Sequence, residues 1–139
     1  HAHGWLHLDL KPQNIMIDRK QHVTVIDIGI AQRKNQDGTA VASGDGTHAF
    51  MAPEQRAGAL VDDRADVFAL AGTLYRLVSQ HNPIAATNEP SVVGTRLDEV
   101  QDLALRAILK KGMAPVAADR YSSAAQLAEA LRGWEQQQR

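Results

Sequence analysis

Two charged side chains near the start of the sequence, Asp9 and Lys11, have the types and spacing that phosphate chemistry needs. Because they are two residues apart, they share one face of an extended loop. The carboxylate can orient a hydroxyl nucleophile and accept its proton, and the amine can meet the charge that develops on a transferring phosphoryl group. Phosphoryl transfer depends mainly on positioning and on charge neutralisation. The pair therefore favours phosphoryl transfer, although either residue alone is typical of a solvated turn.

A second pair, Asn14 and Asp27, is expected to meet across a β-hairpin. Two β-prone runs and a polar turn lie between or beside them, at 15–17, 23–26 and 19–22. If Asp18 pairs with Val23, Asn14 lies directly opposite Asp27, with Cβ atoms about 5 Å apart. Two hard oxygen donors, with room left for water and phosphate oxygens, suit Mg²⁺ bound to a nucleotide.

The composition and periodicity of two further stretches indicate their structure. Residues 29–50 are rich in small and polar residues and lack periodicity, which is typical of a long functional loop. From near Asp62 to Val78, apolar residues cover almost the whole circumference of a helix. A helix that is apolar all round belongs in the middle of a core.

Two more helices are expected after a connector rich in proline and glycine. Residues 97–110 have amphipathic spacing and end in a basic pair before Gly112. Ser123 and Gln126 form a capping-box pattern that opens a last helix through about Trp134. The predicted layout is a hairpin, a long loop and a bundle of helices.

Composition excludes several classes of protein. The 139 residues have 44% hydrophobic and 22% charged residues, as one soluble globular domain does. A net charge of −1 gives no reason to expect a nucleic-acid partner. The absence of cysteine excludes disulfides and thiolate metal sites, and no apolar stretch is long enough to span a membrane. A cytoplasmic location is expected, though a longer parent protein could be membrane-anchored.

Five short motifs, in order and at matching spacing, resemble those of eukaryotic-like protein kinases. Segment 7–14 resembles their catalytic loop, and Asp27-Ile28-Gly29 resembles their Asp-Phe-Gly magnesium motif. The end of an activation segment, the aspartate of a central helix and an arginine-bearing segment are matched at Gly46–Glu54, Asp66 and Asp119–Tyr121. The sequence Ala52-Pro53-Glu54-Gln55 most resembles the corresponding segment of bacterial serine/threonine kinases.

The resemblance implies a fold and a domain. Residues 1–139 would form a partial kinase domain, the C-terminal lobe, with a catalytic loop at 7–14 and an activation segment at 27–54. The fold class is α+β, mainly helical, with a short antiparallel β-hairpin that carries the catalytic loop. The implied substrates are ATP, with Mg²⁺ or Mn²⁺, and a protein that offers a serine or threonine hydroxyl.

The resemblance also implies roles for the residues of the site. Asp9 would be the catalytic base and Lys11 the phosphate contact, and Asn14 and Asp27 would hold the metal ions. Lys11 followed by Pro12 is typical of serine/threonine rather than tyrosine kinases.

Further roles rest on the resemblance alone. Thr47 would tie the substrate-facing loop to Asp9, and Met16 would lie under the adenine ring. Glu54 would pair with Arg120 as an internal brace. His7, by contrast, is expected to be a packed, hydrogen-bonded histidine rather than an acid–base group.

Two departures from the family pattern qualify this interpretation. Leu8 stands where many kinases have an arginine that receives an activation-loop phosphate, so activation through Thr39 or Ser43 is not expected. Only six residues precede His7, and they contain no glycine-rich loop and no strand lysine. We therefore expect the isolated chain to need an N-terminal lobe in cis and to have negligible activity alone. A pseudokinase-like scaffold and an inactive truncated fragment are the alternatives.

Overall fold

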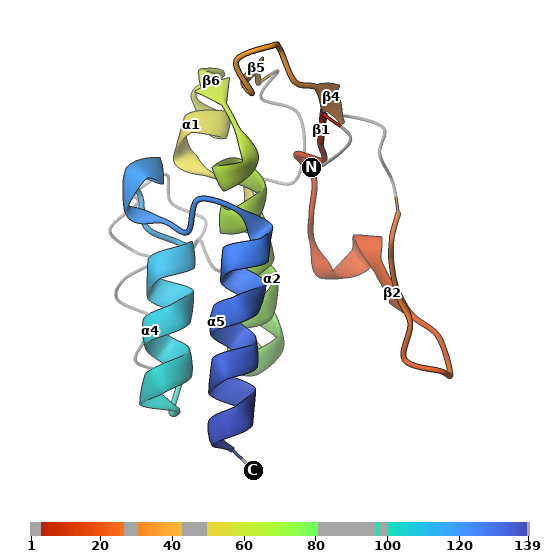
Figure 1. The fold of residues 1–139 in the computed structure, drawn as a ribbon, viewed down its shortest axis with the longest axis vertical. Helices are drawn as coiled ribbons and strands as arrows, with labels where there is room; N and C mark the ends of the chain where they lie inside the picture. Colours follow the sequence, from red (N-terminus) through yellow and green to blue (C-terminus); the bar gives the residue numbers. More distant parts are fainter. Residues whose placement is uncertain (1–3, 27–30, 43–49, 81–96, 98–99, 139) are drawn as a thin grey trace.

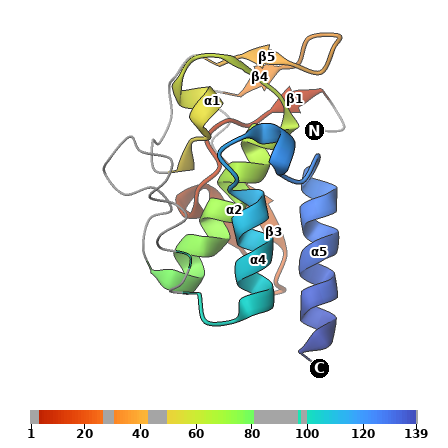
Figure 2. The ribbon, with the colours of Figure 1, turned by 90° about the vertical axis from the view of Figure 1, so that its left-hand side faces the viewer.

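The computed structural model describes residues 4–26, 31–42, 50–80, 97 and 100–138 (Figure 1). Its main elements, with η for 3₁₀ helices, are β1 (Trp5–Leu6), η1 (Pro12–Asn14), β2 (Ile15–Ile17), β3 (Val23–Val25), β4 (Gln32–Arg33), β5 (Ala40–Val41), α1 (Pro53–Arg56), β6 (Leu60–Val61), α2 (Asp63–Ser79), α4 (Leu103–Gly112), η4 (Ala117–Asp119) and α5 (Ala124–Gln137). Helices α2, α4 and α5 pack against one another, and the short strands lie to one side and at one end of them (Figures 1 and 2). Helices combined with small antiparallel sheets agree with the predicted α+β class.

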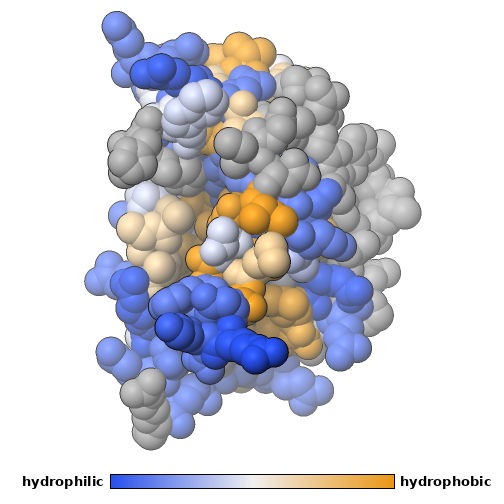
Figure 3. Space-filling view, turned by 90° about the vertical axis from the view of Figure 1, so that its right-hand side faces the viewer, coloured by the Kyte–Doolittle hydropathy of each residue, from blue (hydrophilic) through white to orange (hydrophobic). Residues whose placement is uncertain are grey.

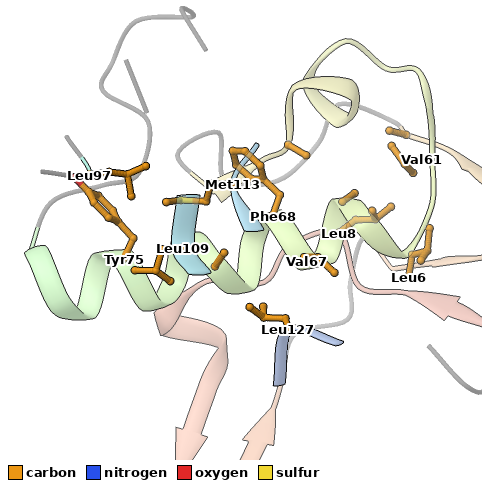
Figure 4. Packing of buried hydrophobic residues seen from close by; sticks show 14 of the residues in the cluster. Leu6, Leu8, Val61, Val67, Phe68, Tyr75, Leu97, Leu109, Met113 and Leu127 are labelled. Carbon is orange, nitrogen blue, oxygen red and sulfur yellow. The ribbon is translucent and has the colours of Figure 1, made fainter. Parts of the chain in front are cut away.

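Helix α2 runs through the core, as its apolar circumference predicts. Asp62 caps the helix by accepting a hydrogen bond from the Arg64 N–H at 3.0 Å. Burial by itself would raise the pKa of Asp62, but hydrogen bonds from the side chain and N–H of Arg64 outweigh it and lower that pKa. Val67, Phe68 and Tyr75 are buried, and they belong to the same apolar cluster as Leu8, Leu97, Leu109, Met113 and Leu127 (Figure 4).

The last turn of α2 departs from the prediction. Leu77 and Val78 are exposed, although the sequence pattern places them within the buried circumference. Periodicity indicates the directions around a helix axis in which apolar side chains point, but it does not indicate how far the neighbouring elements extend along that axis.

Helix α4 begins later than the predicted range 97–110. It starts at Leu103, because the Asp102 carboxylate accepts the Leu105 N–H at 3.0 Å and so caps the helix. The apolar spacing predicted over 97–110 is right in part, since Leu97 and Val100 are buried and Ile108 packs against the core, whereas Leu103 is 70% exposed. Leu105 and Leu109, which lie outside that spacing, are buried. A start six residues later moves the face that packs against the core.

Helix α5 begins where the capping pattern predicts and is tied to α4 by a tryptophan. Ser123 caps it by accepting a hydrogen bond from the Gln126 N–H at 3.2 Å. The Trp134 indole N–H donates to Asp102 Oδ2 at 3.0 Å. Hydrogen bonds from the Leu105 N–H and then from Trp134 lower the pKa of the Asp102 carboxyl. One aspartate therefore caps α4 and holds α5 beside it.

The hairpin of β2 and β3 forms, but with a register one residue away from the predicted one. Ile15 pairs with Val25, so Asn14 faces Ile26 instead of Asp27, and the Ile26 N–H donates to the Asn14 carbonyl at 2.8 Å. The loop has three residues rather than four, because Gln21 takes a left-handed conformation with φ of 64°. Nothing at this position in the sequence, such as a glycine, signals that conformation.

The stretch predicted as one loop, 29–50, contains two short strands. β4 pairs with β1, and β5 pairs with β6, each antiparallel over two residues. Strands this short have too few residues for an alternating pattern to be recognised in the sequence. They hold the described part of this stretch against β1 and the start of α2.

Helices α2 and α4 approach closely at Gly112. A Cβ atom added to Gly112 would lie 2.6 Å from the Cβ of Ala71, which is fully buried on α2. A backbone contact this close requires glycine on one of the two helices. The small residue at the end of α4 is therefore a packing requirement as well as a helix stop.

We predict that Gly112→Ala destabilises the 139-residue chain by about 1–3 kcal/mol, because the added methyl group forces α4 away from α2. Alanine is otherwise the better helix former. Gly133→Ala is the matched control, since beyond its own helix backbone and chain neighbours no atom of the described residues lies within 4 Å of the added Cβ, and it should stabilise the chain by roughly 0.5–1 kcal/mol. Urea denaturation measures both. Adding Ala71→Gly to Gly112→Ala should recover part of the loss, and equal stabilities of Gly112→Ala and wild type would contradict the close contact.

Candidate active site

A buried carboxylate joins the 7–14 segment to the central helix. Asp66, in the first turn of α2, is 1% exposed and accepts hydrogen bonds from the backbone N–H groups of His7 and Leu8, each at 2.9 Å. A buried carboxylate is tolerated when such donors surround it. Asp66 is the aspartate that the family resemblance assigns to the central helix, and its geometry shows that it holds this segment in place.

The residue before Asp9 has an unusual backbone. Leu8 has φ of 64°, in the left-handed region that costs a non-glycine residue roughly 1–2 kcal/mol. Its side chain is buried in the core, and its N–H donates to Asp66. Burial and hydrogen bonding together hold a conformation that the residue alone would avoid. The chain therefore turns sharply at the point where Asp9 begins.

His7 is a structural histidine, as expected. The Asp9 N–H donates to its Nδ1 at 3.1 Å, so this nitrogen accepts and the other, Nε2, carries the hydrogen. Nε2 lies 3.0 Å from the carbonyl oxygen of Ile26, at the end of β3. The neutral ring thus links the 7–14 segment to the hairpin immediately before Asp27.

Asp9 and Lys11 lie together, as their spacing predicts, and Asn14 lies beside them. Asn14 is buried, and its Nδ2 donates to the Asp9 carbonyl at 2.7 Å and lies 3.5 Å from Asp9 Oδ2. The Lys11 ammonium lies 3.7 Å from the same Asp9 Oδ2. Pro12 opens the 3₁₀ helix η1 that brings Asn14 back beside Asp9. A carboxylate, an ammonium group and an amide therefore converge on one side of the segment.

Three of the other predicted site residues receive less support from the geometry. Asp27 and Thr47 lie outside the described residues, so their meeting with Asn14 and Asp9 stays a prediction. Met16 is 58% exposed on β2, and its contact with adenine also stays a prediction. In the part of the chain that the structure describes, no three His, Cys, Asp or Glu side chains are placed to bind a metal ion.

The predicted brace between Glu54 and Arg120 is confirmed. The Arg120 side chain is fully buried, and it donates to Glu54 Oε1 at 2.5 Å and to Oε2 at 2.9 Å. It also donates to the carbonyl oxygens of Arg64, Ala114 and Pro115. The guanidinium fork matches this set of acceptors, which no ammonium group could do. The brace fixes α1 beside the start of α2.

A second ion pair, which the sequence did not predict, holds β4 to α2. The Lys34 ammonium lies 2.9 Å from Asp63 Oδ1, and the Lys34 N–H donates to the Gly4 carbonyl.

Thr39, a candidate phosphorylation site, is hydrogen-bonded to a carboxylate. The Thr39 hydroxyl donates to Asp37 at 2.6 Å and lowers the pKa of that carboxyl. A phosphate on Thr39 would lie beside this like charge.

Sequence reasoning also missed Gln55. Its side chain is 2% exposed on α1, and its Nε2 donates to the Leu8 carbonyl at 2.5 Å. Neither the length of α1 nor the residues around Gln55 distinguish it from a solvent-exposed glutamine. The only signal available was its place directly after the Ala-Pro-Glu motif.

Comparison with known proteins identifies the family of this chain. Residues 1–139 match the model of the family described as Protein kinase domain. The chain is 37% identical to the serine/threonine-protein kinase PknH of Mycobacterium tuberculosis strain H37Rv, over 92% of this chain and 22% of that protein. It is 34% identical to PknB of Mycolicibacterium smegmatis, over 91% and 22%, and 36% identical to the tyrosine-protein kinase MasK of Myxococcus xanthus, over 91% and 21%.

This chain belongs to the protein kinase family. It is similar to serine/threonine kinases of mycobacteria and also to a kinase named for tyrosine. It spans about a fifth of the length of these relatives.

We predict that Glu54→Gln destabilises the chain by about 3 kcal/mol, because it leaves the buried Arg120 guanidinium without a counter-charge. Glu129→Gln, at an exposed position of α5, is the matched control and should change stability by less than about 0.5 kcal/mol. Urea denaturation of the 139-residue chain measures both variants. A Glu54→Gln protein as stable as the control would mean that the brace contributes no net stability.

Proposed function

We propose that this chain is the catalytic part of a protein kinase that transfers the γ-phosphoryl group of ATP to serine or threonine hydroxyl groups of proteins. The observation that carries the proposal is the cluster of Asp9, Lys11 and Asn14, held against α2 through Asp66. Membership of the protein kinase family supports the same reaction. Use of ATP favours a cytoplasmic site of action.

In this proposal Asp9 is the base. Its carboxylate orients the acceptor hydroxyl and takes the proton as the oxygen attacks the γ-phosphorus atom. The Lys11 ammonium, 3.7 Å from that carboxylate, meets the negative charge on the phosphoryl oxygens. Because Asn14 fixes the Asp9 carbonyl, the carboxylate needs little rearrangement before it can act.

Asn14 has the chemistry to hold Mg²⁺ or Mn²⁺. Its Nδ2 is directed toward Asp9, so the amide oxygen is the end that can bind a cation, and hard oxygen donors suit these ions. We propose Asp27 as the second ligand residue. The bound ion would neutralise charge on the phosphate groups of ATP. Thr47 is proposed to tie the substrate-facing loop to Asp9.

The hairpin supports a further part of the proposal, an N-terminal lobe in cis that closes over ATP. Met16, Ile17, Val23 and Val25 are exposed apolar side chains on β2 and β3. Apolar surface also gathers in the middle of the side of the molecule that carries the hairpin, between hydrophilic regions (Figure 3). A patch of this kind marks a surface that another part of a protein covers. We propose that Met16 packs under the adenine ring and that the isolated chain has negligible activity.

No helix among the described residues is both long and apolar enough to cross a membrane.

The proposed preference for serine and threonine rests on Lys11-Pro12 and on relatives named for these residues, whereas MasK is named for tyrosine. Phosphoamino-acid analysis of the product separates the two specificities.

We predict that Asp9→Asn lowers phosphoryl transfer by roughly 10²–10⁴-fold, because the amide cannot accept the hydroxyl proton. The measurement is transfer of labelled phosphate from ATP to casein by a protein that carries this chain together with an N-terminal lobe. Asp18→Asn, at the exposed hairpin turn, makes the same chemical change outside the site and should retain the wild-type rate.

An unchanged rate in Asp9→Asn would remove Asp9 from the mechanism. Phosphotyrosine as the main product would overturn the proposed acceptor specificity. Robust turnover by the 139-residue chain alone would overturn the requirement for an N-terminal lobe.

A further inference from the structure

The peptide bond that leads into Asp9 is held at both of its polar atoms. On one side, the Leu8 carbonyl oxygen accepts a hydrogen bond from Gln55 Nε2 at 2.5 Å. On the other, the Asp9 N–H donates to His7 Nδ1 at 3.1 Å. A peptide plane fixed at its oxygen and at its nitrogen cannot rotate without breaking both bonds.

The rotation of this peptide bears directly on Asp9. Leu8 is in the left-handed region, and its N–H is bonded to Asp66, which fixes the backbone before the turn. Gln55 binds the carbonyl oxygen of Leu8, which belongs to the peptide bond between Leu8 and Asp9. Rotation of this peptide bond would redirect the Asp9 carboxylate. Without this donor, the Leu8 carbonyl would lose a hydrogen bond in a buried region, where an unsatisfied oxygen is unfavourable.

Gln55 can impose this orientation because its own position is fixed. It is 2% exposed and lies in α1, next to Glu54, whose carboxylate is bound to the buried Arg120. The donor thus comes from the short helix that ends the 27–54 segment, and that helix is anchored to the core. Contact between Gln55 and Leu8 spans 47 residues of sequence.

We propose that Gln55 is a positioning residue for Asp9: by holding the Leu8–Asp9 peptide, it sets the direction of the carboxylate and couples α1 to the 7–14 segment. The inference rests on the proposed function, in which Asp9 is the base. Gln55 touches neither ATP nor the acceptor in this role, and it acts only through the backbone of Leu8.

A structural test uses the full 139-residue chain and does not depend on activity. Gln55→Met keeps the length of the side chain but removes the donor. It should change the NMR shifts of the Leu8 carbonyl carbon and the Asp9 amide nitrogen. Thr73→Val is the matched control, because Thr73 is also buried and its hydroxyl donates to a backbone carbonyl, that of Ala69, within α2. The control should leave both shifts as in the wild type.

Gln55→Glu gives a second, reversible test with nearly the same side-chain shape. The substituted carboxyl can donate to the Leu8 carbonyl only when it is protonated. As the pH falls through the titration of that group, both shifts should therefore approach those of the wild-type chain recorded at the same pH. Wild-type shifts in Gln55→Met, or no return in Gln55→Glu at low pH, would overturn the proposed hydrogen bond.

A kinetic test uses the protein that carries this chain with an N-terminal lobe. Gln55→Met should lower kcat by about 10- to 100-fold, as misplacement of a catalytic group does, while the KM for ATP stays within about two-fold and Thr73→Val keeps the wild-type kcat. A wild-type kcat in Gln55→Met, despite altered shifts, would overturn the positioning role. A wild-type protein that transfers no phosphate would instead count against the proposed function, and the NMR shifts would still decide whether Gln55 orients the peptide.

Discussion

The carboxylate of Asp66 is the interaction on which the geometry of the site depends. It is buried in the first turn of α2 and accepts the N–H groups of His7 and Leu8. A buried carboxylate needs hydrogen-bond donors such as these. Two consecutive residues are thereby fixed to the most buried helix, and Asp9 follows directly. The contacts of a buried helix therefore determine the position of the proposed base.

The core supports this arrangement through contacts far from the site. Ala71 of α2 meets Gly112 of α4 too closely for a second methyl group, and Asp102 holds α5 beside α4. Arg120 binds Glu54 and fixes α1. These contacts determine where α2 and α1 lie, and the two helices supply the groups that hold the turn at Leu8. Interiors packed this tightly transmit small displacements, so helix packing and site geometry are linked.

Much of the fold follows from signals that are local in the sequence. The extent of α2, the start of α5 at Ser123 and the proximity of Asp9 to Lys11 depend on periodicity, capping and short spacing, and they are confirmed. The register argument placed Asn14 opposite Asp27, whereas the structure pairs it with Ile26 and places its amide beside Asp9. The Glu54–Arg120 pair is separated by 66 residues and came only from the family resemblance.

The errors share a physical cause. The hairpin register depends on the left-handed Gln21, and the start of α4 depends on the Asp102 cap. Neither feature follows from the hydrophobic periodicity of the segment. The role of Gln55 depends on a tertiary contact with Leu8 that has no local pattern. Sequence spacing therefore predicts which groups are available, whereas backbone conformation and long-range hydrogen bonds decide where they point.

The most direct test is amide hydrogen exchange, followed by NMR, in Asp66→Asn. An asparagine has the same shape but only one acceptor oxygen and no charge. His7 and Leu8 donate to different oxygens of Asp66, so at least one of their two amides should exchange about ten-fold faster than in the wild type or more, while the amides in the middle of α2 keep their protection. If His7 and Leu8 exchange at wild-type rates in the folded variant, the buried carboxylate does not hold the segment that carries Asp9.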